Sequence, residues 1–290
     1  MIVVSGEASK GLGQKVAEKL NAKMVDVNVK VFPDGEYCLR FGGDVAGEEV
    51  VVVQTTGPPQ DTNVMQLLLM LDGLKDLGAK KVTAVVPYMA FARQDKRFLA
   101  GEAISAHTLV KLIEACGVDK FITVNIHSKS ILDKFSVPTM NLSAITLLAE
   151  HFKSRGLDGA FSLSPDKGAI ALAEEANRVL GGGCGWLKKE RDRYTGEIQV
   201  EEKLLDVKGR DVIVFDDIIS TGGTTTRAIA MLKSQGARRV YSACVHALLV
   251  GEAKAKIAKA GAEEIVGTDS LSSTTGTVSL APLIVEALAR

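Results

Sequence analysis

Short apolar runs rich in β-branched residues alternate along the chain with amphipathic segments of helical length. In the first half, the predicted strands are 48–54, 81–88 and 121–126, and the predicted helices are 62–77 and 102–116. In the second half, the predicted strands are 159–166, 211–217, 239–247 and 263–269, and the predicted helices are 168–180, 223–235 and 252–260. Strands that alternate with helices indicate parallel βαβ units, so the sequence predicts an α/β fold.

The two halves of the chain also resemble each other. The segment LGAKKVTAVV (77–86) can be aligned with QGARRVYSAC (235–244), and each follows a predicted helix that itself follows an apolar strand. We therefore predict two similar domains, each a mostly parallel sheet flanked by helices. The pattern is interrupted at 137–143, where a proline precedes a helix start. We place the N-terminal domain at 1–141 and the C-terminal domain at 142–290.

Composition excludes several classes of function. The 290 residues include 35 Lys and Arg and 35 Asp and Glu, so no overall charge attracts nucleic acid or an anionic membrane, and an anionic ligand must be bound locally. No apolar stretch is long enough to span a bilayer. The four cysteines are scattered without a C-x-x-C pair, which favours reduced thiols in a cytoplasmic protein.

The stretch VIVFDDIISTGGTT (212–225) carries the clearest chemical signal in the sequence. It runs from a predicted strand through a turn into a predicted helix, and ligands of parallel sheets bind at the carboxyl ends of the strands. A helix N-terminus offers unpaired N–H groups, and glycines let the backbone approach a ligand closely. We therefore predict a phosphate site formed by Ser220, Thr221, Gly222, Gly223 and Thr224.

Two adjacent carboxylates, Asp216 and Asp217, end the same strand. Carboxylates repel phosphate, so they suit the vicinal hydroxyls of a sugar, bound directly or through a divalent cation. Together with the turn they predict a site for a ribose that carries a 5-phosphate. The simpler alternative is that the aspartates end a strand and the hydroxyl residues cap a helix.

The stretch resembles the fingerprint by which type I phosphoribosyltransferases and ribose-phosphate pyrophosphokinases bind phosphoribosyl diphosphate (PRPP). Further segments resemble the second family, in an archaeal-like variant, over nearly the whole chain. They are KVFPDGEYCLRF (30–41), VPYMAFARQDKRF (86–98), NIHSKS (125–130), SPDKGA (164–169) and LKKER (187–191). The resemblance implies transfer of the diphosphoryl group of ATP to the 1-hydroxyl of ribose 5-phosphate, which gives PRPP and AMP.

The resemblance also implies roles for individual residues. Lys189 and Arg191 match the catalytic cations of the family's flexible loop. His127 and Asp166 match positions associated with Mg²⁺, the expected cofactor. A lone histidine or aspartate at a strand end is otherwise commonly structural, and a charged run such as 188–210 is otherwise a solvated hairpin or loop.

The expected ATP site uses two segments of the first half. Phe32 matches the aromatic residue that the family places over adenine from a neighbouring subunit, with Asp34 and Glu36 contacting the base. The match therefore predicts a homodimer or a higher homo-oligomer. The basic loop that follows the strand 81–88 supplies the remaining ATP-binding candidates, which are Arg93, Gln94 and Asp95.

Two departures from many members of the family are visible. Asn125 stands where many members have aspartate, and LAGEAIS (99–105) stands where many bacterial members have Arg-Ser-Arg-Glu-Pro-Ile. The missing arginines remove the basis for expecting activation by phosphate and inhibition by ADP. Two alternatives remain, a phosphoribosyltransferase that consumes PRPP and a non-catalytic regulator that binds phosphoribosyl ligands.

Overall fold

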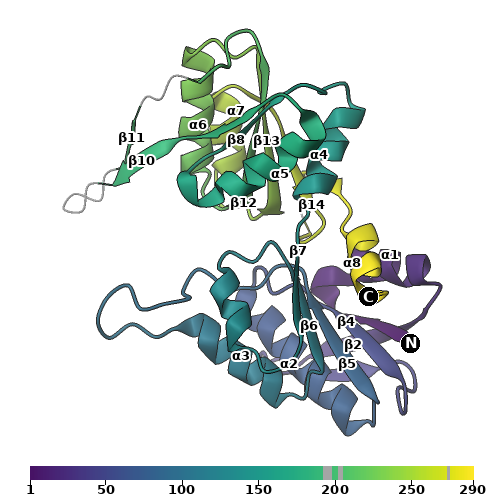
Figure 1. The fold of residues 1–290 in the computed structure, drawn as a ribbon. Helices are drawn as coiled ribbons and strands as arrows, with labels where there is room; N and C mark the ends of the chain where they lie inside the picture. The colour runs from purple at the N-terminus through teal and green to yellow at the C-terminus, as the bar shows by residue number, and fades with distance from the viewer. Residues whose placement is uncertain (192–197, 202–204, 273–274) are drawn as a thin grey trace. The chain divides into compact units, whose positions relative to one another are not determined.

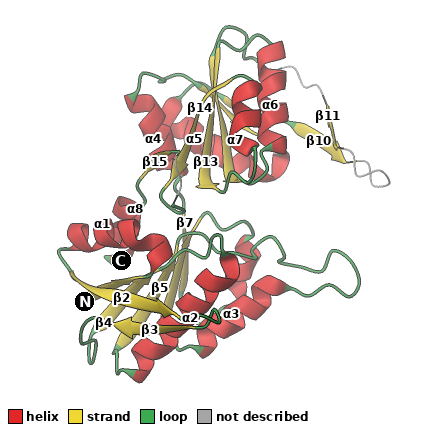
Figure 2. Ribbon diagram, turned by 180° about the vertical axis from the view of Figure 1, so that it is seen from behind, coloured by secondary structure: helices red, strands yellow, loops and turns green. Residues whose placement is uncertain are grey.

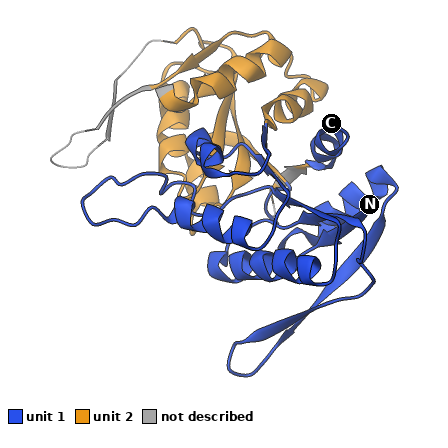
Figure 3. Ribbon diagram, turned by 60° about the horizontal axis from the view of Figure 1, so that its bottom comes forward, with its two compact units in different colours: residues 1–142, 269–272, 279–290 blue, residues 143–268, 273–278 orange. Residues whose placement is uncertain are grey.

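The chain forms two compact units in a computed structural model, which describes residues 1–191, 198–201, 205–272 and 275–290 (Figure 1). The first unit comprises Met1–Leu142, Asp269–Ser272 and Ser279–Arg290, and the second comprises Ser143–Thr268 and Ser273–Val278 (Figure 3). Among the described residues, no helix combines the length and the apolar character needed to cross a membrane.

The first unit is built on a seven-stranded sheet in the order β3-β2-β1-β4-β5-β6-β7. Its strands are β1 (Ile2–Ser5), β2 (Lys23–Val31), β3 (Tyr37–Phe41), β4 (Glu49–Val53), β5 (Lys81–Val86), β6 (Lys120–Val124) and β7 (Thr139–Leu142). Every neighbouring pair is parallel except β2 and β3, which form an antiparallel hairpin. Val50 to Val53 are all buried, because a central parallel strand is covered on both faces.

Helices cover both faces of this sheet (Figure 2). They are α1 (Lys10–Leu20), α2 (Gln60–Asp76), α3 (Ser105–Ala115) and α8 (Ala281–Leu288), with short 3₁₀ turns at η1 (Glu7–Ser9) and η2 (Lys129–Lys134). Helix α1 packs against α8, and α2 packs against α3. Right-handed crossovers place α1 and α2 on opposite faces, because the chain leaves the sheet centre in opposite directions after β1 and β4.

The second unit contains a six-stranded parallel sheet in the order β9-β8-β12-β13-β14-β15. The strands are β8 (Phe161–Ser164), β9 (Cys184–Trp186), β12 (Asp211–Ile219), β13 (Arg239–Ala247), β14 (Ala262–Thr268) and β15 (Gly276–Val278). The helices are α4 (Ile145–Ser154), α5 (Ile170–Leu180), α6 (Gly223–Ser234) and α7 (Ala253–Lys259), and η3 (Lys167–Ala169) precedes α5. A separate antiparallel hairpin pairs β10 (Lys188–Arg191) with β11 (Ile198–Glu201).

The two units share one topology. In the first, β2-β1-β4-β5-β6-β7 follow one another across the sheet, and in the second β9-β8-β12-β13-β14-β15 do so. Corresponding helices connect corresponding strands, with α1 and α5 after the first strand of each unit and α2 and α6 after β4 and β12. This agreement is what the aligned segments in the two halves of the sequence predict. The α/β fold class is confirmed.

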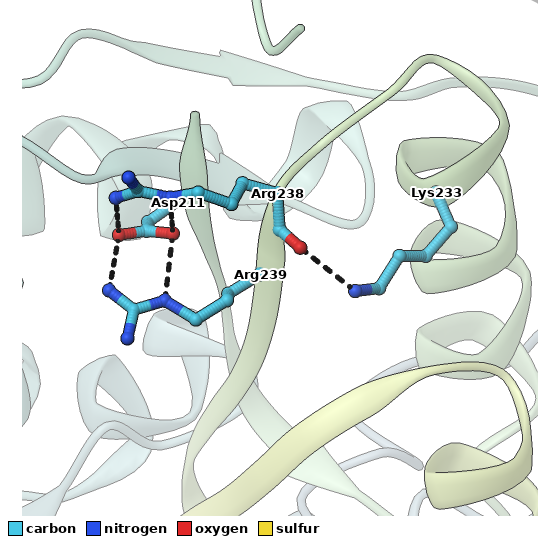
Figure 4. Close-up of polar contacts among 4 residues, drawn as sticks. All are labelled: Asp211, Lys233, Arg238 and Arg239. Atoms are coloured by element: carbon cyan, nitrogen blue, oxygen red, sulfur yellow. Dashed lines mark hydrogen bonds and ion pairs between the residues drawn. The ribbon is translucent and has the colours of Figure 1, made fainter. Parts of the chain in front are cut away.

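The amino ends of β12 and β13 are joined by a buried carboxylate (Figure 4). Asp211 accepts two hydrogen bonds from Arg238, at 2.9 and 2.5 Å, and two from Arg239, at 3.0 and 2.7 Å. Lys233 of α6 donates to the carbonyl oxygen of Arg238 at 3.3 Å. These bonds tie the start of two neighbouring strands together at the end of the sheet away from the predicted ligand site.

The last helix, α8, groups with the first unit, whereas the sequence predicts a C-terminal domain that extends to residue 290. Ala281, Ile284 and Ala287 of α8 are buried, and α8 contacts α1 and β7 of the first unit. Lys15 of α1 also forms an ion pair with Asp269 at 2.9 Å. After β15 the chain therefore returns to the first unit, because the apolar face of α8 packs there.

Candidate active site

The acidic strand end lies in the middle of the second sheet. Asp216 and Asp217 belong to β12, which is paired with β8 on one side and β13 on the other. The Asp217 N–H donates to Asp216 Oδ1 at 3.0 Å, and the Ile218 N–H donates to Asp217 Oδ1 at 2.8 Å. Burial, followed by the nearby charges of Asp217 and Asp166, raises the pKa of Asp216 well above its usual range. This concentration of carboxylates favours a cation or the hydroxyl donors of a sugar.

Asp166 lies on the loop that follows β8, the strand beside β12. Its Oδ1 accepts a hydrogen bond from the Ala169 N–H at 3.2 Å, and its carbonyl oxygen accepts one from Ser164 Oγ at 2.7 Å. Parallel strands end at the same edge of a sheet, and the electrostatic effect of Asp166 on Asp216 places both carboxylates in one neighbourhood. The structure thus brings a predicted metal residue to the predicted sugar site.

The turn after β12 has the backbone geometry that an anion site requires. Gly222 caps α6 in the left-handed region at φ 75°, and its carbonyl oxygen accepts the Thr226 N–H at 2.8 Å. A methyl group at Gly223 would come no closer than 4.0 Å to Arg227, so the first turn of the helix is open there. Thr221 is exposed, and Ser220 and Thr224 are half-buried. Backbone N–H groups of this first turn can therefore bind phosphate.

In the first unit, two loops that carry predicted nucleotide and metal residues are bonded to each other. Asp95 lies on the loop after β5, and its Oδ2 accepts a hydrogen bond from Ser128 Oγ at 2.6 Å. Ser128 follows His127, which is exposed on the loop after β6. Arg93 is exposed, whereas the Gln94 amide group donates to Glu102 at 3.2 Å. Asp95 and the His127 loop therefore form one polar cluster at the carboxyl ends of β5 and β6.

The residues expected to contact adenine lie at the tip of the β2–β3 hairpin. The Phe32 N–H donates to the Glu36 carbonyl at 2.7 Å, and the Glu36 N–H donates to Asp34 Oδ1 at 3.1 Å. Gly35 has φ 94°, which this turn requires. The Phe32 side chain is exposed, with Lys30 Nζ 4.9 Å from its ring centroid. The hairpin tip thus leaves Phe32, Asp34 and Glu36 exposed.

The expected catalytic cations belong to the β10–β11 hairpin. Lys189 pairs with Val200 and Arg191 pairs with Ile198 along the antiparallel ladder. The side chains of Lys189 and Arg191 lie outside the part of the chain that the structure describes. Their roles stay predictions.

The carboxylates at the carboxyl ends of β8 and β12 are donors of the kind that Mg²⁺ prefers. Within the described residues, no group of three or more His, Cys, Asp or Glu side chains could hold a metal ion. Mg²⁺ commonly uses one or two protein ligands and completes its shell with phosphate oxygens and water. Asp166, beside the half-buried Asp216, provides hard oxygen donors of the kind that such an ion prefers.

Comparisons with known proteins agree with this geometry. A family model described as the N-terminal domain of ribose phosphate pyrophosphokinase matches residues 1–117, and one described as a phosphoribosyl transferase domain matches residues 143–272. The ribose-phosphate pyrophosphokinase of Methanobrevibacter smithii is 44% identical over 99% of both chains. The chain belongs to the ribose-phosphate pyrophosphokinase family. The pyrophosphokinase of Methanothermobacter thermautotrophicus is 43% identical, again over 99% of both chains.

A solved structure of the family has the same fold. The phosphoribosylpyrophosphate synthetase of Mycobacterium smegmatis superposes with a TM-score of 0.89 at 30% identity, covering 99% of this chain and 97% of its own. The pyrophosphokinase fold thus extends over the whole chain, including both units.

Sequence reasoning missed two residues of the site. Ser128 was part of a quoted motif without a role, and it proves to hold Asp95. Glu102 was noted only as part of a divergent segment, and its carboxylate accepts three hydrogen bonds from the loop that carries Arg93 to Asp95. Neither residue belongs to a motif of regular spacing, because each acts through hydrogen bonds to other positions in the loops.

Proposed function

We propose that this pyrophosphokinase transfers the diphosphoryl group of ATP to the 1-hydroxyl of ribose 5-phosphate, giving PRPP and AMP. The observation that carries the proposal is the end of β12, where Asp216 and Asp217 precede an open, glycine-capped helix N-terminus in a chain related to pyrophosphokinases over its full length. The carboxylates can bind the hydroxyls of a sugar, and the N-terminus of α6 can bind its phosphate.

Ribose 5-phosphate binds with its two ends in different environments. The 5-phosphate accepts hydrogen bonds from the backbone N–H groups of 221–224 and from the hydroxyls of Ser220, Thr221 and Thr224. Asp216 and Asp217 accept hydrogen bonds from the ring hydroxyls. This orientation fixes the position of the anomeric hydroxyl, so binding the phosphate also aligns the attacking group.

ATP is bound by the loop residues Arg93, Gln94 and Asp95, and its adenine stacks on Phe32 of a neighbouring subunit beside Asp34 and Glu36. The exposed hairpin tip supports this arrangement. The enzyme then works as a homodimer or a larger homo-oligomer.

When bound through His127 and Asp166, Mg²⁺ would offset phosphate charge. The absence of disulfides among its four cysteines supports a cytoplasmic location.

Lys189 and Arg191 neutralise the negative charge that develops as the diphosphoryl group is transferred. Replacing either by Ala should lower kcat by about 100-fold or more and change the affinity for ribose 5-phosphate little, since the charge arises only in the transition state. Steady-state kinetics with separate substrate titrations measure both effects. An unchanged kcat would remove the residue from the catalytic step.

The nucleotide released identifies the reaction. Incubation with MgATP and ribose 5-phosphate should yield AMP, detected by chromatography, because the β- and γ-phosphoryl groups leave together. Release of ADP alone contradicts the proposal. Consumption of PRPP with a free base would indicate a phosphoribosyltransferase, and ligand binding without turnover at saturating Mg²⁺ would indicate a regulator.

A further inference from the structure

The loop between β5 and α3 folds around a single carboxylate. Glu102 Oε2 accepts hydrogen bonds from the Phe98 N–H at 2.8 Å and from the Leu99 N–H at 3.0 Å. The same oxygen accepts one from the Gln94 amide group at 3.2 Å, and the Glu102 carbonyl accepts one from Arg97 Nε at 2.8 Å. These four bonds join both ends and the middle of residues 94–102, so the segment forms a closed loop, which we call the Glu102 clasp.

The clasp depends on the ionised carboxylate. Hydrogen bonds from the Leu99 N–H and then the Phe98 N–H lower the pKa of Glu102, so the group is charged at neutral pH and its bonds are charge-assisted. Two of the donors are backbone groups of residues whose side chains are exposed, Phe98 at 57% and Leu99 at 71%. Few apolar contacts therefore hold this segment, and the carboxylate is its main source of order.

The clasp is attached to the residues proposed to bind ATP. Gln94 is itself one of its members, and Arg93 and Asp95 flank Gln94 in the chain. Asp95 is fixed from the other side by Ser128 Oγ at 2.6 Å. The conformation of Arg93 to Asp95 is thus set by two anchors, one in the loop after β6 and one at Glu102.

We propose that Glu102 is a positioning residue for nucleotide binding, which holds the loop carrying Arg93, Gln94 and Asp95 in its binding conformation. The inference rests on the proposed function, in which this loop contacts the polyphosphate of ATP. Without the carboxylate, three donors lose their acceptor and the loop populates open conformations. Binding must then order the loop, so the apparent affinity for nucleotide falls in proportion to the fraction of molecules whose loop is closed.

The chain offers a matched control for this idea. Glu114 of α3 also uses one carboxylate oxygen to hold a loop in the same unit, accepting bonds from Ser136 Oγ at 2.7 Å and from the Val137 N–H at 3.2 Å. Its loop carries none of the proposed nucleotide residues. Glu114→Ala therefore removes a comparable set of bonds without touching the Glu102 clasp, and Glu102→Gln keeps one carbonyl oxygen that can accept from the backbone.

The test is calorimetric titration of the full-length protein with MgATP in the absence of any sugar phosphate. Glu102→Ala should weaken MgATP binding by about tenfold, the loss expected for a charge-assisted hydrogen-bond set of this kind. Glu102→Gln should recover part of the affinity, and Glu114→Ala should stay close to the wild type. Hydrogen exchange of the Phe98 and Leu99 amides should quicken in Glu102→Ala, and ribose 5-phosphate affinity should not change.

Three results would overturn the inference. They are unchanged MgATP affinity in Glu102→Ala despite faster exchange of the two amides, an equal loss in Glu114→Ala, and a wild type that does not bind MgATP. A wild type that binds MgATP but releases no AMP with ribose 5-phosphate would instead refute the proposed reaction. The affinities of the variants would still decide whether Glu102 positions the loop.

Discussion

At the residue scale, the two glycines that start α6 have different tasks. Gly222 has φ 75°, and a methyl group there would meet Ile257 Cδ1 at 3.1 Å and Ala253 Cβ at 3.3 Å. Gly223 has an ordinary φ and open space where a methyl group would lie. Gly222 is therefore needed by the fold, whereas Gly223 leaves room for a ligand.

We predict that Gly222→Ala destabilises the protein by about 1–3 kcal/mol, because left-handed backbone is costly for a residue with a Cβ and the neighbours must also shift. Gly223→Ala should change the free energy of unfolding by less than about 0.5 kcal/mol. Urea denaturation followed by circular dichroism measures both values. Equal destabilisation by the two substitutions would show that the turn is not built as described.

The site residues that the sequence predicts are those whose pattern lies within one short, continuous segment. Asp216, Asp217 and the turn residues lie in one continuous stretch, so the sequence alone predicted that they share a strand end and a helix start. Glu102 and Ser128 are defined by bonds across a loop or between two loops, with no regular spacing. Such contacts depend on how the backbone folds back, which periodicity does not encode.

At the scale of elements, Asp211 joins β12 to β13. The Arg239 and Arg238 guanidinium groups hold the pKa of Asp211 far below its usual range. Asp211 is only 8% exposed, but the two arginine side chains are 44% and 62% exposed, so water screens part of the attraction.

Replacing Asp211 by Ala should lower the free energy of unfolding by about 1–3 kcal/mol at neutral pH, because two guanidinium groups lose their shared acceptor. A carboxylate whose pKa is depressed by folding stabilises above its unfolded pKa, and this stability is lost as the pH falls. The difference from wild type should therefore shrink below about pH 4. Asp206→Ala, which removes a 93% exposed carboxylate paired with Arg210, is the control and should change stability little. A pH-independent difference would contradict this account.

The elements that the sequence did not predict include the internal strand β2, two short edge strands and the C-terminal helix. Residues 25–31 of β2 alternate valine with polar residues, a period-two pattern that is typical of a half-buried strand. The strands β7 and β15 are short, and α8 has a start signal only in Pro282. The predicted strands and helices that do appear in the structure are those with long apolar runs or clear helical periodicity.

At the scale of the whole molecule, the two units share one topology, but corresponding strands carry different residues at their carboxyl ends. Strand β12 carries Asp216 and Asp217 near its carboxyl end, whereas the corresponding β4 is followed by Gln54 and Thr55, both buried. The acidic pair is thus confined to the second unit. The first unit instead carries the polar cluster of Asp95 and Ser128.

The C-terminal helix is a structural part of the first unit. Ile284 is fully buried in α8, so Ile284→Ala should lower the free energy of unfolding by about 2–4 kcal/mol. Glu286→Ala removes an ion pair with Arg290 whose side chains are about two-thirds exposed, and it should have little effect. Denaturant unfolding of both variants tests this. Equal stability of Ile284→Ala and wild type would show that α8 is dispensable to the unit.

The most direct test of the central claim is whether the turn after β12 binds the phosphate of a pentose phosphate. Calorimetric titration of the wild type should show binding of ribose 5-phosphate but not of ribose at the same concentration. Gly223→Ala, which leaves the fold intact, should weaken ribose 5-phosphate binding by about tenfold, because the added methyl group obstructs the approach of phosphate to the helix N-terminus. Equal binding of ribose 5-phosphate by wild type and Gly223→Ala, or equal binding of ribose and ribose 5-phosphate, would contradict the account.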